Sequence, residues 1–425
     1  MNRNFRVEFG FVRSDLVFRP VSEQWSALSR GVDKIEPEAE LREKLRRSVE
    51  SGQPLRVKYG IDPTGIDVHL GHTVPLRKLR QFQDLGHTAV IIIGNYTALV
   101  GDPSGRDETR SKLTEAQVEA NAKDYLLQVG KIIDLSRAEV HHNGDWFSKF
   151  SFLQVLDLCR RMTIGQMTAR EDFAKRIAAE KPVYLHECLY PLMQGWDSVE
   201  IRADVELGGS EQLFSLLVAR DLQREQGQAP QVAMTLPILV GTDGVRRMGK
   251  SLGNYVGVAD DPSTMFGKIM SIPDEPMRQY FLLLTEMPLS DVERYLASGT
   301  NPRDSKDALA RQIITFYHGA AAAEEASRQF RERARGEFDF GAIEALVIRS
   351  SDLVNGTILP GKLLQAAQFV KSASEGARKV NEGAAWLGEA RVPLSEGMKA
   401  IEVRDGMIVG MGKGTKTKAK RIRLD

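Results

Sequence analysis

The stretch Leu55–Gly94, LRVKYGIDPTGIDVHLGHTVPLRKLRQFQDLGHTAVIIIG, contains the pattern of a strand, a helix and a second strand. Leu55–Ile61 is typical of a strand, and Gly71–Leu85 has the apolar spacing of an amphipathic helix that ends at Gly86. Thr88–Gly94 is rich in β-branched residues, as expected of a strand buried on both faces. This order predicts a parallel, right-handed crossover and therefore an α/β fold with a parallel sheet.

Further elements are predicted on the C-terminal side of this unit. Thr114–Ile133 is expected to be a helix, and Phe152–Arg176 is expected to be mostly helical. Val232–Val240 has the composition of a strand, with a proline inside it, and residues 260–345 are predicted to be helical. Because a chain of 425 residues exceeds one ordinary core, two or three domains are expected.

The composition is that of a globular protein in a reducing compartment. Hydrophobic residues make up 42% of the chain and charged residues 27%, and the net charge of +1 predicts no partner by itself. Two cysteines are too few for a disulfide framework or a thiolate zinc site. No apolar run is long enough to span a bilayer, and charged residues interrupt the first twenty positions. A cytoplasmic location is therefore expected.

The motif His69-Leu70-Gly71-His72 lies at the start of the predicted helix. A helix N-terminus presents free N–H groups and a positive dipole end, which suits phosphate groups. Glycine lets a ligand approach the backbone closely, and histidines three residues apart lie on one helical face. Taken alone, this motif is better explained by a turn with incidental histidines or by a metal site, although no third ligand at metal-binding spacing is present.

A second motif, Arg247-Met248-Gly249-Lys250-Ser251, follows the turn Gly241–Gly244. Mobile cations such as Arg247 and Lys250 can close over a pyrophosphate leaving group and stabilise charge that is present mainly in the transition state. Taken alone, a solvated basic turn explains this stretch better. Together, the two motifs predict a bipartite site that holds a nucleoside triphosphate from two sides.

The two motifs resemble the signature motifs of the class I aminoacyl-tRNA synthetases. Within that class, the chain is similar to the tyrosyl-tRNA synthetases of bacteria, and the resemblance extends from about residue 32 to the C-terminus. The other stretches that carry it are Gly60–Thr64, Val100–Gly105, Tyr190–Asp197 and Leu207–Gln212. The resemblance is specific because these separate motifs agree in order and spacing.

The resemblance implies an enzyme whose substrates are L-tyrosine, ATP and tRNA(Tyr). The tyrosine carboxylate would attack the α-phosphate of ATP, releasing pyrophosphate, and the tyrosyl group would then pass to the terminal adenosine of the tRNA. Mg²⁺ is expected to accompany ATP, and no tightly bound protein metal is expected. Because no covalent enzyme intermediate forms, catalysis would rest on positioning and charge stabilisation.

The resemblance also assigns roles by motif position. The expected catalytic residues are Thr64, His69, His72, Arg247, Lys250 and Ser251. The expected ATP-binding residues are Gly60, Asp62, Gly71, Gly209, Glu211 and Lys250, of which Gly209 and Glu211 fall at the ribose. The expected tyrosine-binding residues are Asp102, Tyr190, Gln194, Asp197 and Gln212. Arg106 and Arg110 are expected to reach the leaving group.

Asp197 matters most for the choice of substrate. The resemblance places it against the phenolic hydroxyl, where a buried carboxylate penalises phenylalanine because its desolvation goes uncompensated. A carboxylate on a helix surface would explain Asp197 equally simply, but Tyr190 and Gln194 fall on the same helical face. This shared face favours a role in binding.

Five positions depart from the better-known family pattern and suggest the second bacterial subgroup. Lys58 stands where one subgroup has a second tyrosine that touches the substrate hydroxyl; it is expected to point away or to pair with an acid. The other departures are Trp196, Glu211, Arg247 and Gly249. Arginine at 247 keeps the charge of the family's lysine but changes its donor geometry.

The resemblance implies four regions. They are a catalytic domain with a Rossmann-type parallel sheet at residues 1–255, which has a dimer-forming insertion at about 113–199, a helical domain at 256–345 that reads the anticodon stem, a linker at 346–360, and a small α+β RNA-binding domain at 361–425. The residues expected to bind tRNA are Lys413, Lys416, Lys418, Lys420 and Arg421. An unstructured basic tail is the alternative for this segment. A homodimer is expected, although Leu153, Leu156, Leu158 and Met162 fit an internal core equally well.

Three competing functions were weighed against this one. A tryptophanyl-tRNA synthetase usually lacks both the C-terminal domain and the carboxylate at position 197. A biosynthetic paralogue would make an aminoacyl-adenylate without charging tRNA, and the basic tail argues against it. A pure RNA-binding or splicing protein on a dead synthetase fold would be expected to lose the phosphate-binding residues, yet His69, His72 and Lys250 are all present.

Overall fold

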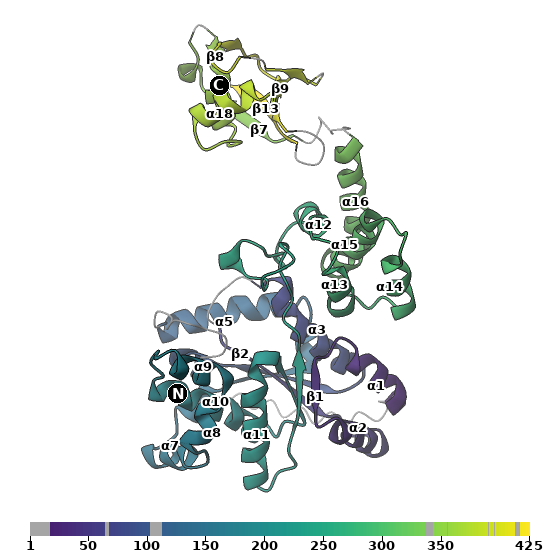
Figure 1. Cartoon of the computed structure of the whole chain (residues 1–425), viewed down its shortest axis with the longest axis vertical. Coiled ribbons are helices and arrows are strands. Elements are labelled where there is room, and N and C mark those ends of the chain that lie inside the picture. The colour runs from purple at the N-terminus through teal and green to yellow at the C-terminus, as the bar shows by residue number, and fades with distance from the viewer. Residues whose placement is uncertain are drawn as a thin grey trace, which may run out of the picture. The chain divides into compact units, whose positions relative to one another are not determined.

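The computed structural model describes residues 18–63, 68–102, 113–335, 343–354, 356–389, 391–394, 396–412 and 417–425. The chain folds into two compact units, Met1–Gly319 and Ala320–Asp425 (Figure 1). The boundary between the units falls inside the predicted helical domain at 256–345. The division into four regions stays a prediction.

The described part of the first unit contains a six-stranded sheet in the order β1-β6-β5-β2-β3-β4. Its strands are β1 (Lys34–Glu36), β2 (Arg56–Ile61), β3 (Thr88–Ile93), β4 (Ala138–His142), β5 (Val205–Gly209) and β6 (Val232–Leu236). All neighbours pair in parallel except β1, which runs antiparallel to β6. The predicted strand–helix–strand unit and its parallel pairing are therefore confirmed.

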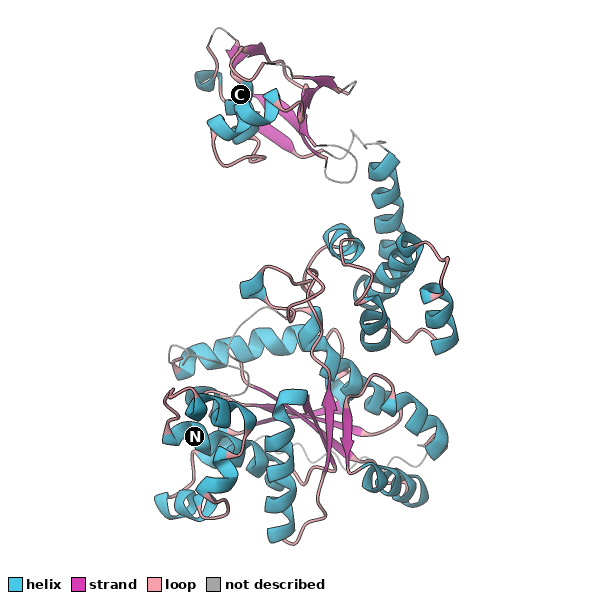
Figure 2. Ribbon diagram, in the orientation of Figure 1, coloured by secondary structure: helices cyan, strands magenta, loops and turns pink. Residues whose placement is uncertain are grey.

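Helices cover both faces of this sheet (Figure 2). The described helices of the first unit are α1 (Val21–Ser29), α2 (Glu38–Ser51), α3 (Leu70–Asp84), α4 (Thr97–Val100), α5 (Glu115–Val129), α6 (Gly144–Phe147), α7 (Phe152–Cys159), α8 (Ile164–Thr168), α9 (Glu171–Ala178), α10 (Leu185–Glu200), α11 (Leu213–Glu225), α12 (Pro262–Met270), α13 (Met277–Leu284), α14 (Leu289–Leu296) and α15 (Pro302–His318). The last four of them, α12 to α15, pack mainly on one another beyond the end of the sheet (Figure 2). Among the described residues, no helix has both the length and the apolar character needed to cross a membrane.

The two faces of the sheet differ in chemistry because side chains alternate along each strand. One face is apolar and packs against α1, α2, α3 and α5; Val57, Ile91 and Val205 belong to this core. The opposite face lies towards α10 and α11, and there β2 and β5 carry Lys58 and Glu206, both fully buried. The first face holds the fold together, whereas the second contains buried charge that needs a separate explanation.

The second unit contains the helix α16 (Ala320–Arg335) and a smaller α+β core. Its described sheet has the order β10-β9-β12-β13-β7, and a two-stranded sheet pairs β11 with β8. The elements are β7 (Ala345–Ile348), β8 (Thr357–Ile358), α17 (Pro360–Ala366), α18 (Ala373–Asn381), β9 (Ala385–Leu387), β10 (Val392–Pro393), β11 (Ile401–Glu402), β12 (Ile408–Met411) and β13 (Lys418–Leu424). Buried residues of both helices and the larger sheet form one core.

Candidate active site

The first motif forms the N-terminus of α3, as predicted. His69 caps the helix in an extended conformation, and its ring stacks on His72 with the centroids 3.7 Å apart. Burial, helped by His72, lowers the pKa of His69 to about 3, so this imidazole is neutral. Its Nδ1 is buried and has no hydrogen-bond partner in the described structure. A neutral ring with an unused nitrogen is suited to a hydrogen bond with a ligand.

The second motif forms a tight loop that ends in a short 3₁₀ turn, Lys250–Leu252. Asn254 is buried and holds this loop together: its Nδ2 donates to Asp243 Oδ2 (2.9 Å) and to the carbonyl of Arg247 (3.1 Å), and its Oδ1 accepts from Gly249 N (2.9 Å). The side chains of Arg247 and Lys250 are exposed. The loop backbone is thus fixed while its cations face solvent.

The structure brings the two motifs together. Residues on either side of the helix start pair with the segment that follows the loop, because Leu70 N donates to Val256 O and Val258 N donates to Val68 O, both at 2.9 Å. His69 forms an antiparallel bridge with Gly257. Segments about 180 residues apart in the chain therefore lie side by side, as a site that grips one ligand from two directions requires.

Gly71 lies at the point of closest approach. A Cβ at this position would lie 3.5 Å from Met248 Cβ and 3.0 Å from the His69 ring. A side chain here would have to displace the His69 ring, whereas its distance to Met248 is an ordinary contact. The preference for glycine at this position therefore comes from packing within the first motif and from close access for a ligand.

The predicted tyrosine-binding residues gather at the carboxyl ends of the parallel strands, where ligands of such sheets bind. Tyr190 on α10 donates its hydroxyl to Asp62 Oδ2 at 2.9 Å, just beyond β2. Thr97 donates to Asp62 Oδ1 at 2.7 Å and accepts from Asn143 Nδ2 at 3.0 Å. A Cβ at Gly94 would collide with both Asp62 and Thr97. This chain of hydrogen bonds links the ends of three strands.

Asp197 lies at the far end of the same network, and 4% of its surface is exposed. Its Oδ1 accepts from Trp146 Nε1 at 3.0 Å and its Oδ2 accepts from Asn143 Nδ2 at 3.3 Å. Burial raises the pKa of Asp197 to about 7, against the opposing charge of Lys58 and these two hydrogen bonds. A carboxylate has about four acceptor positions, so it can still accept a bond from a substrate hydroxyl.

Acidic groups also surround Tyr190. Burial, then the charges of Asp102 and Asp62, raise the pKa of its phenol well above the usual value. Gln194 lies one turn further along α10; its Nε2 donates to Glu206 and its Oε1 is buried with no hydrogen-bond partner in the described structure. Carboxylates beside an unused amide oxygen favour an ammonium group as ligand.

The predicted ribose-binding residues follow β5. Gln212 Oε1 accepts from Gly209 N at 2.9 Å. A Cβ at Gly208 would lie 2.9 Å from the same oxygen, and one at Gly209 would lie 2.5 Å from Glu211 Oε1. A side chain at Gly208 would displace the Gln212 amide, and one at Gly209 would displace the Glu211 carboxylate. Gly60, at the end of β2, has open space where a side chain would be.

Several predicted residues lie outside the described residues: Thr64, Arg106, Arg110, Lys413 and Lys416. Ser251 is described and exposed. Over the ranges that the structure describes, no group of three His, Cys, Asp or Glu residues is placed to hold a metal ion.

Of the predicted tRNA-binding residues, three lie on β13 of the second unit. Lys418 is exposed. Lys420 is half-buried and pairs with Glu344 at 3.2 Å, so its charge is partly engaged. Arg421 Nη1 donates to Gly406 O at 3.4 Å. In its described part, the basic segment forms β13, an inner strand that lies between β12 and β7. The alternative of a wholly unstructured tail is therefore wrong.

Sequence reasoning missed the partners that hold the site: Asn143, Trp146, Glu206 and Asn254. Asn143 and Trp146 follow the carboxyl end of β4, so the strand-end rule would have indicated them had that strand been recognised. Lys58 pairs with an acid, Glu206, which is one of the two arrangements expected for it. No local pattern indicates that Asn254 holds the loop together, because its hydrogen-bond partners Asp243, Arg247 and Gly249 are spread along the turn before it.

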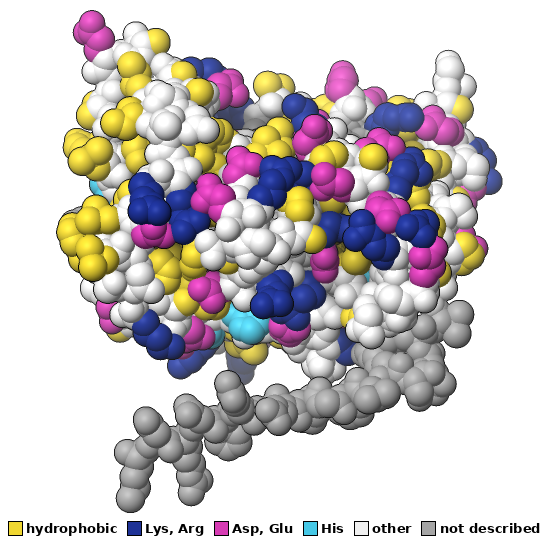
Figure 3. Space-filling model, turned by 90° about the horizontal axis from the view of Figure 1, so that it is seen from below, with side chains coloured by type: hydrophobic (Ala, Val, Ile, Leu, Met, Phe, Trp, Pro, Cys, Tyr) yellow, Lys and Arg dark blue, Asp and Glu magenta, His cyan; other side chains and the backbone are white. Residues whose placement is uncertain are grey.

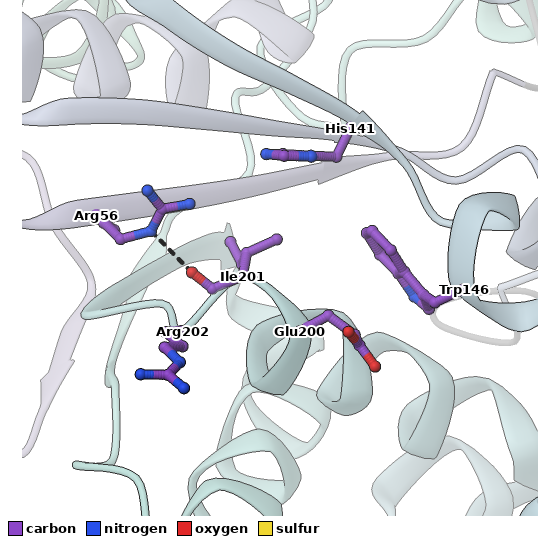
Figure 4. A pocket seen from close by; sticks show the side chains of 6 residues that line it. All are labelled: Arg56, His141, Trp146, Glu200, Ile201 and Arg202. Atoms are coloured by element: carbon purple, nitrogen blue, oxygen red, sulfur yellow. Dashed lines mark hydrogen bonds between the residues drawn. The ribbon is translucent and has the colours of Figure 1, made fainter. Parts of the chain in front are cut away.

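A cavity of about 390 Å³ lies beside Trp146, the residue whose ring nitrogen donates to Asp197. Its lining residues are Arg56, His141, Trp146, Glu200, Ile201 and Arg202. Figure 4 shows Arg56 and His141 on the strands above the end of α10, with a hydrogen bond from Arg56 to the carbonyl of Ile201 (2.8 Å). None of the predicted substrate-binding residues lines this cavity.

Comparison with known proteins agrees with this geometry. Residues 50–334 match the family model of tRNA synthetases class I (W and Y). The tyrosine–tRNA ligase of Moorella thermoacetica is 47% identical over 92% of this chain and 94% of its own, and that of Symbiobacterium thermophilum is 45% identical over 94% and 97%.

Solved structures agree in fold. A C-terminally truncated mitochondrial tyrosyl-tRNA synthetase of Aspergillus nidulans has a TM-score of 0.60 at 22% identity, covering 74% of this chain and 94% of its own. The enzyme of Archaeoglobus fulgidus, solved with L-tyrosine, has a TM-score of 0.59 at 22% identity, covering 72% and 100%. From the family match and the relatives that span nearly the whole chain, the protein is a member of the class I tRNA synthetases of the tryptophan and tyrosine type.

Proposed function

We propose that the protein is a tyrosine–tRNA ligase. In the first step, a carboxylate oxygen of tyrosine attacks the α-phosphorus of ATP, and the bond from that phosphorus to the pyrophosphate oxygen breaks. In the second step, a hydroxyl of the terminal adenosine of tRNA(Tyr) attacks the activated carbonyl and AMP leaves. The observation that carries the choice of amino acid is the buried carboxylate of Asp197, held by Trp146 and Asn143.

At the amino-acid end, two kinds of acceptor would read the substrate. Asp197 would accept the phenolic hydroxyl, and the free Oε1 of Gln194, with Asp102, would accept the α-ammonium. Tyr190, tied to Asp62, would form one wall between these two acceptors. A substrate without the hydroxyl would leave the carboxylate of Asp197 desolvated and without its third partner.

At the ATP end, the two motifs would act on opposite sides of the phosphates. The unused nitrogen of His69 and the α3 N-terminus lie on one side. The exposed cations of Arg247 and Lys250 lie on the loop across from them and would meet the charge that develops on pyrophosphate. Mg²⁺ as the companion of ATP, and a cytoplasmic location, stay predictions from the sequence.

A tryptophan-specific enzyme is the main alternative, because the matching family model includes both types. The relatives at 45–47% identity are tyrosine–tRNA ligases, and a buried carboxylate suits a phenol. The deciding experiment is ATP–pyrophosphate exchange with each of the twenty amino acids, followed by charging of total tRNA. Exchange with tyrosine and charging of one tRNA species are expected. Exchange with tryptophan, or exchange without charging, would overturn the proposal.

We also infer that two copies of the chain pair through the predicted insertion. Exposed apolar residues are concentrated there: Phe152, Leu153, Ile164, Tyr184 and Leu185 are each at least half exposed. Hydrophobic side chains gather along one side of the face in Figure 3. The four leucine and methionine residues that fitted either an interface or a core fall into two groups. Leu153 and Leu156 are exposed, whereas Leu158 is buried in the core and the partly buried Met162 packs against it. Exposed apolar surface of this kind is typical of protein–protein interfaces.

A further inference from the structure

Lys58 and Glu206 form an ion pair that is buried beside the predicted tyrosine pocket. They are register partners on the parallel strands β2 and β5, and Lys58 Nζ lies 2.9 Å from Glu206 Oε1 with both side chains at most 1% exposed. A buried pair of this kind is often no more stabilising than apolar residues of the same volume. Stability alone therefore explains poorly why two charges lie in this place.

Lys58 contacts the helix on both sides of Asp197. Its Nζ also donates to the carbonyl of Gln194 at 2.7 Å and to Ser198 Oγ at 2.8 Å. These residues lie three positions before and one position after Asp197 on α10. The ammonium group thus ties the turn that carries Asp197 to the central strand of the sheet.

Glu206 determines how the Gln194 amide is oriented. A carboxylate only accepts hydrogen bonds, so the amide nitrogen must face it; Gln194 Nε2 donates to Glu206 Oε1 at 3.0 Å. The other carboxylate oxygen accepts from Ser198 Oγ at 3.0 Å and from Gln231 Nε2 at 2.5 Å. With the nitrogen held in this way, Gln194 Oε1 is left buried without a hydrogen-bond partner in the described structure.

The same pair acts on the charge of Asp197. Burial raises the pKa of this carboxyl, Lys58 is the strongest influence that lowers it, and Glu206 raises it further but more weakly. The uncharged donors Asn143 and Trp146 also lower it. Other described titratable groups near the pocket include Tyr190 on the same helix, Asp62 after β2, Asp102 after α4, and Arg170, whose Nη2 lies 3.9 Å from Asp102 Oδ1.

We propose that the Lys58–Glu206 pair positions both substrate acceptors: Lys58 holds the turn of α10 that presents Asp197 to the phenolic hydroxyl, and Glu206 turns the Gln194 oxygen towards the α-ammonium. This inference rests on the proposed function. The resemblance implies that one bacterial subgroup has, at the position of Lys58, a tyrosine that touches the substrate hydroxyl directly. Here an indirect contact through Asp197 replaces it.

The test is the pH profile of kcat/KM for tyrosine in pyrophosphate exchange, measured on the full chain. Lys58→Met is expected to move the acidic limb to higher pH and to raise KM for tyrosine about tenfold near pH 7, as a shift of one unit would. Glu206→Gln is expected to move the limb to lower pH, while KM rises on the alkaline plateau because the Gln194 amide is no longer fixed. Opposite shifts are required, because the two charges act on Asp197 with opposite sign.

Lys78→Met is the matched control. Lys78 is also a buried lysine, and its Nζ donates to the carbonyls of Leu28 and Arg30 at 2.9 and 2.8 Å, away from α10. This variant is expected to be less stable without a shift of the acidic limb. Should a single variant fail to fold, the double variant Lys58→Met/Glu206→Gln removes both charges and is expected to show a smaller shift to higher pH.

Shifts in the same direction, or no shift in any of these variants, would overturn the positioning role. The proposed function fails separately, if the unaltered chain shows no tyrosine-dependent exchange. A lower kcat for exchange in Lys58→Met, with the acidic limb unmoved and KM for tyrosine unchanged, would also contradict the inference, since a purely structural contact predicts that result.

Discussion

Replacing Asp197 by asparagine tests the substrate choice most directly. The change removes the charge and keeps the shape of the side chain. Asp197 Oδ1 accepts from Trp146 Nε1 at 3.0 Å, and Oδ2 accepts from Asn143 Nδ2 at the longer distance of 3.3 Å. The new amide nitrogen is expected to face Asn143, because that residue keeps its second acceptor, Thr97 Oγ1, at 3.0 Å.

The size of the effect follows from the lost hydrogen bond. A hydrogen bond to a charged acceptor contributes about 1.5–3 kcal/mol, and a neutral one about 1 kcal/mol. At about 1.4 kcal/mol per factor of ten, full loss of the charged bond to tyrosine lowers kcat/KM roughly 10- to 150-fold. Phenylalanine makes no such bond, so its kcat/KM is expected to stay level or to rise. The tyrosine-to-phenylalanine ratio should therefore fall by the full factor.

The assay is ATP–pyrophosphate exchange with the two amino acids in competition, repeated between pH 5.5 and 9. Burial raises the pKa of Asp197 to about 7, so the charged acceptor is lost as the pH falls through that value. The parent enzyme is expected to lose kcat/KM for tyrosine on the acid side of this point, and Asp197→Asn should lack that limb. An equal loss for both amino acids, or an acidic limb that survives the substitution, would refute the assignment.

Three further outcomes are expected. Lys250→Ala should slow adenylate formation about 100- to 1,000-fold, the effect of losing one transition-state donor, while tyrosine binding measured by equilibrium dialysis is unchanged; a normal exchange rate would contradict its role. If the proposed dimer forms through the insertion, Leu153→Glu should convert it to a monomer in sedimentation experiments with little loss of stability, whereas Leu158→Ala in the core should cost about 2–5 kcal/mol of unfolding free energy. Lys418→Ala with Arg423→Ala should weaken tRNA charging and lower the salt slope by about 0.9 per lost phosphate contact, with exchange unaffected; an unchanged slope would exclude these residues from the RNA interface.

Local pattern was sufficient for the elements of the catalytic unit. The predicted helix Gly71–Leu85 is observed at Leu70–Asp84, and the predicted strand Thr88–Gly94 at Thr88–Ile93. The helix signal is the spacing of its apolar residues, and the strand signal is a continuous run of β-branched residues; both reflect which positions are buried. The predicted strand Val232–Val240 ends earlier, at Leu236, because Pro237 cannot donate to the ladder.

Pairing between distant segments was not predicted. The short strand β1 joins the sheet antiparallel to β6, and β7, which begins at the last residue of the predicted helical region 260–345, pairs in parallel with β13. Neither short strand has enough residues for a periodic signal. Strands of this length are stabilised by their neighbours and not by their own composition.

The sequence by itself determined the α/β class, the strand–helix–strand unit, and a helix face shared by Tyr190, Gln194 and Asp197, because each depends on spacing within one segment. Only the tertiary structure decided which distant groups complete the site. Three contacts join segments far apart in the chain. The N-terminus of α3 contacts the segment after the loop Arg247–Ser251, Trp146 donates to Asp197, and Glu206 pairs with Lys58. Such contacts arise from packing and burial, so no local pattern of residues records them.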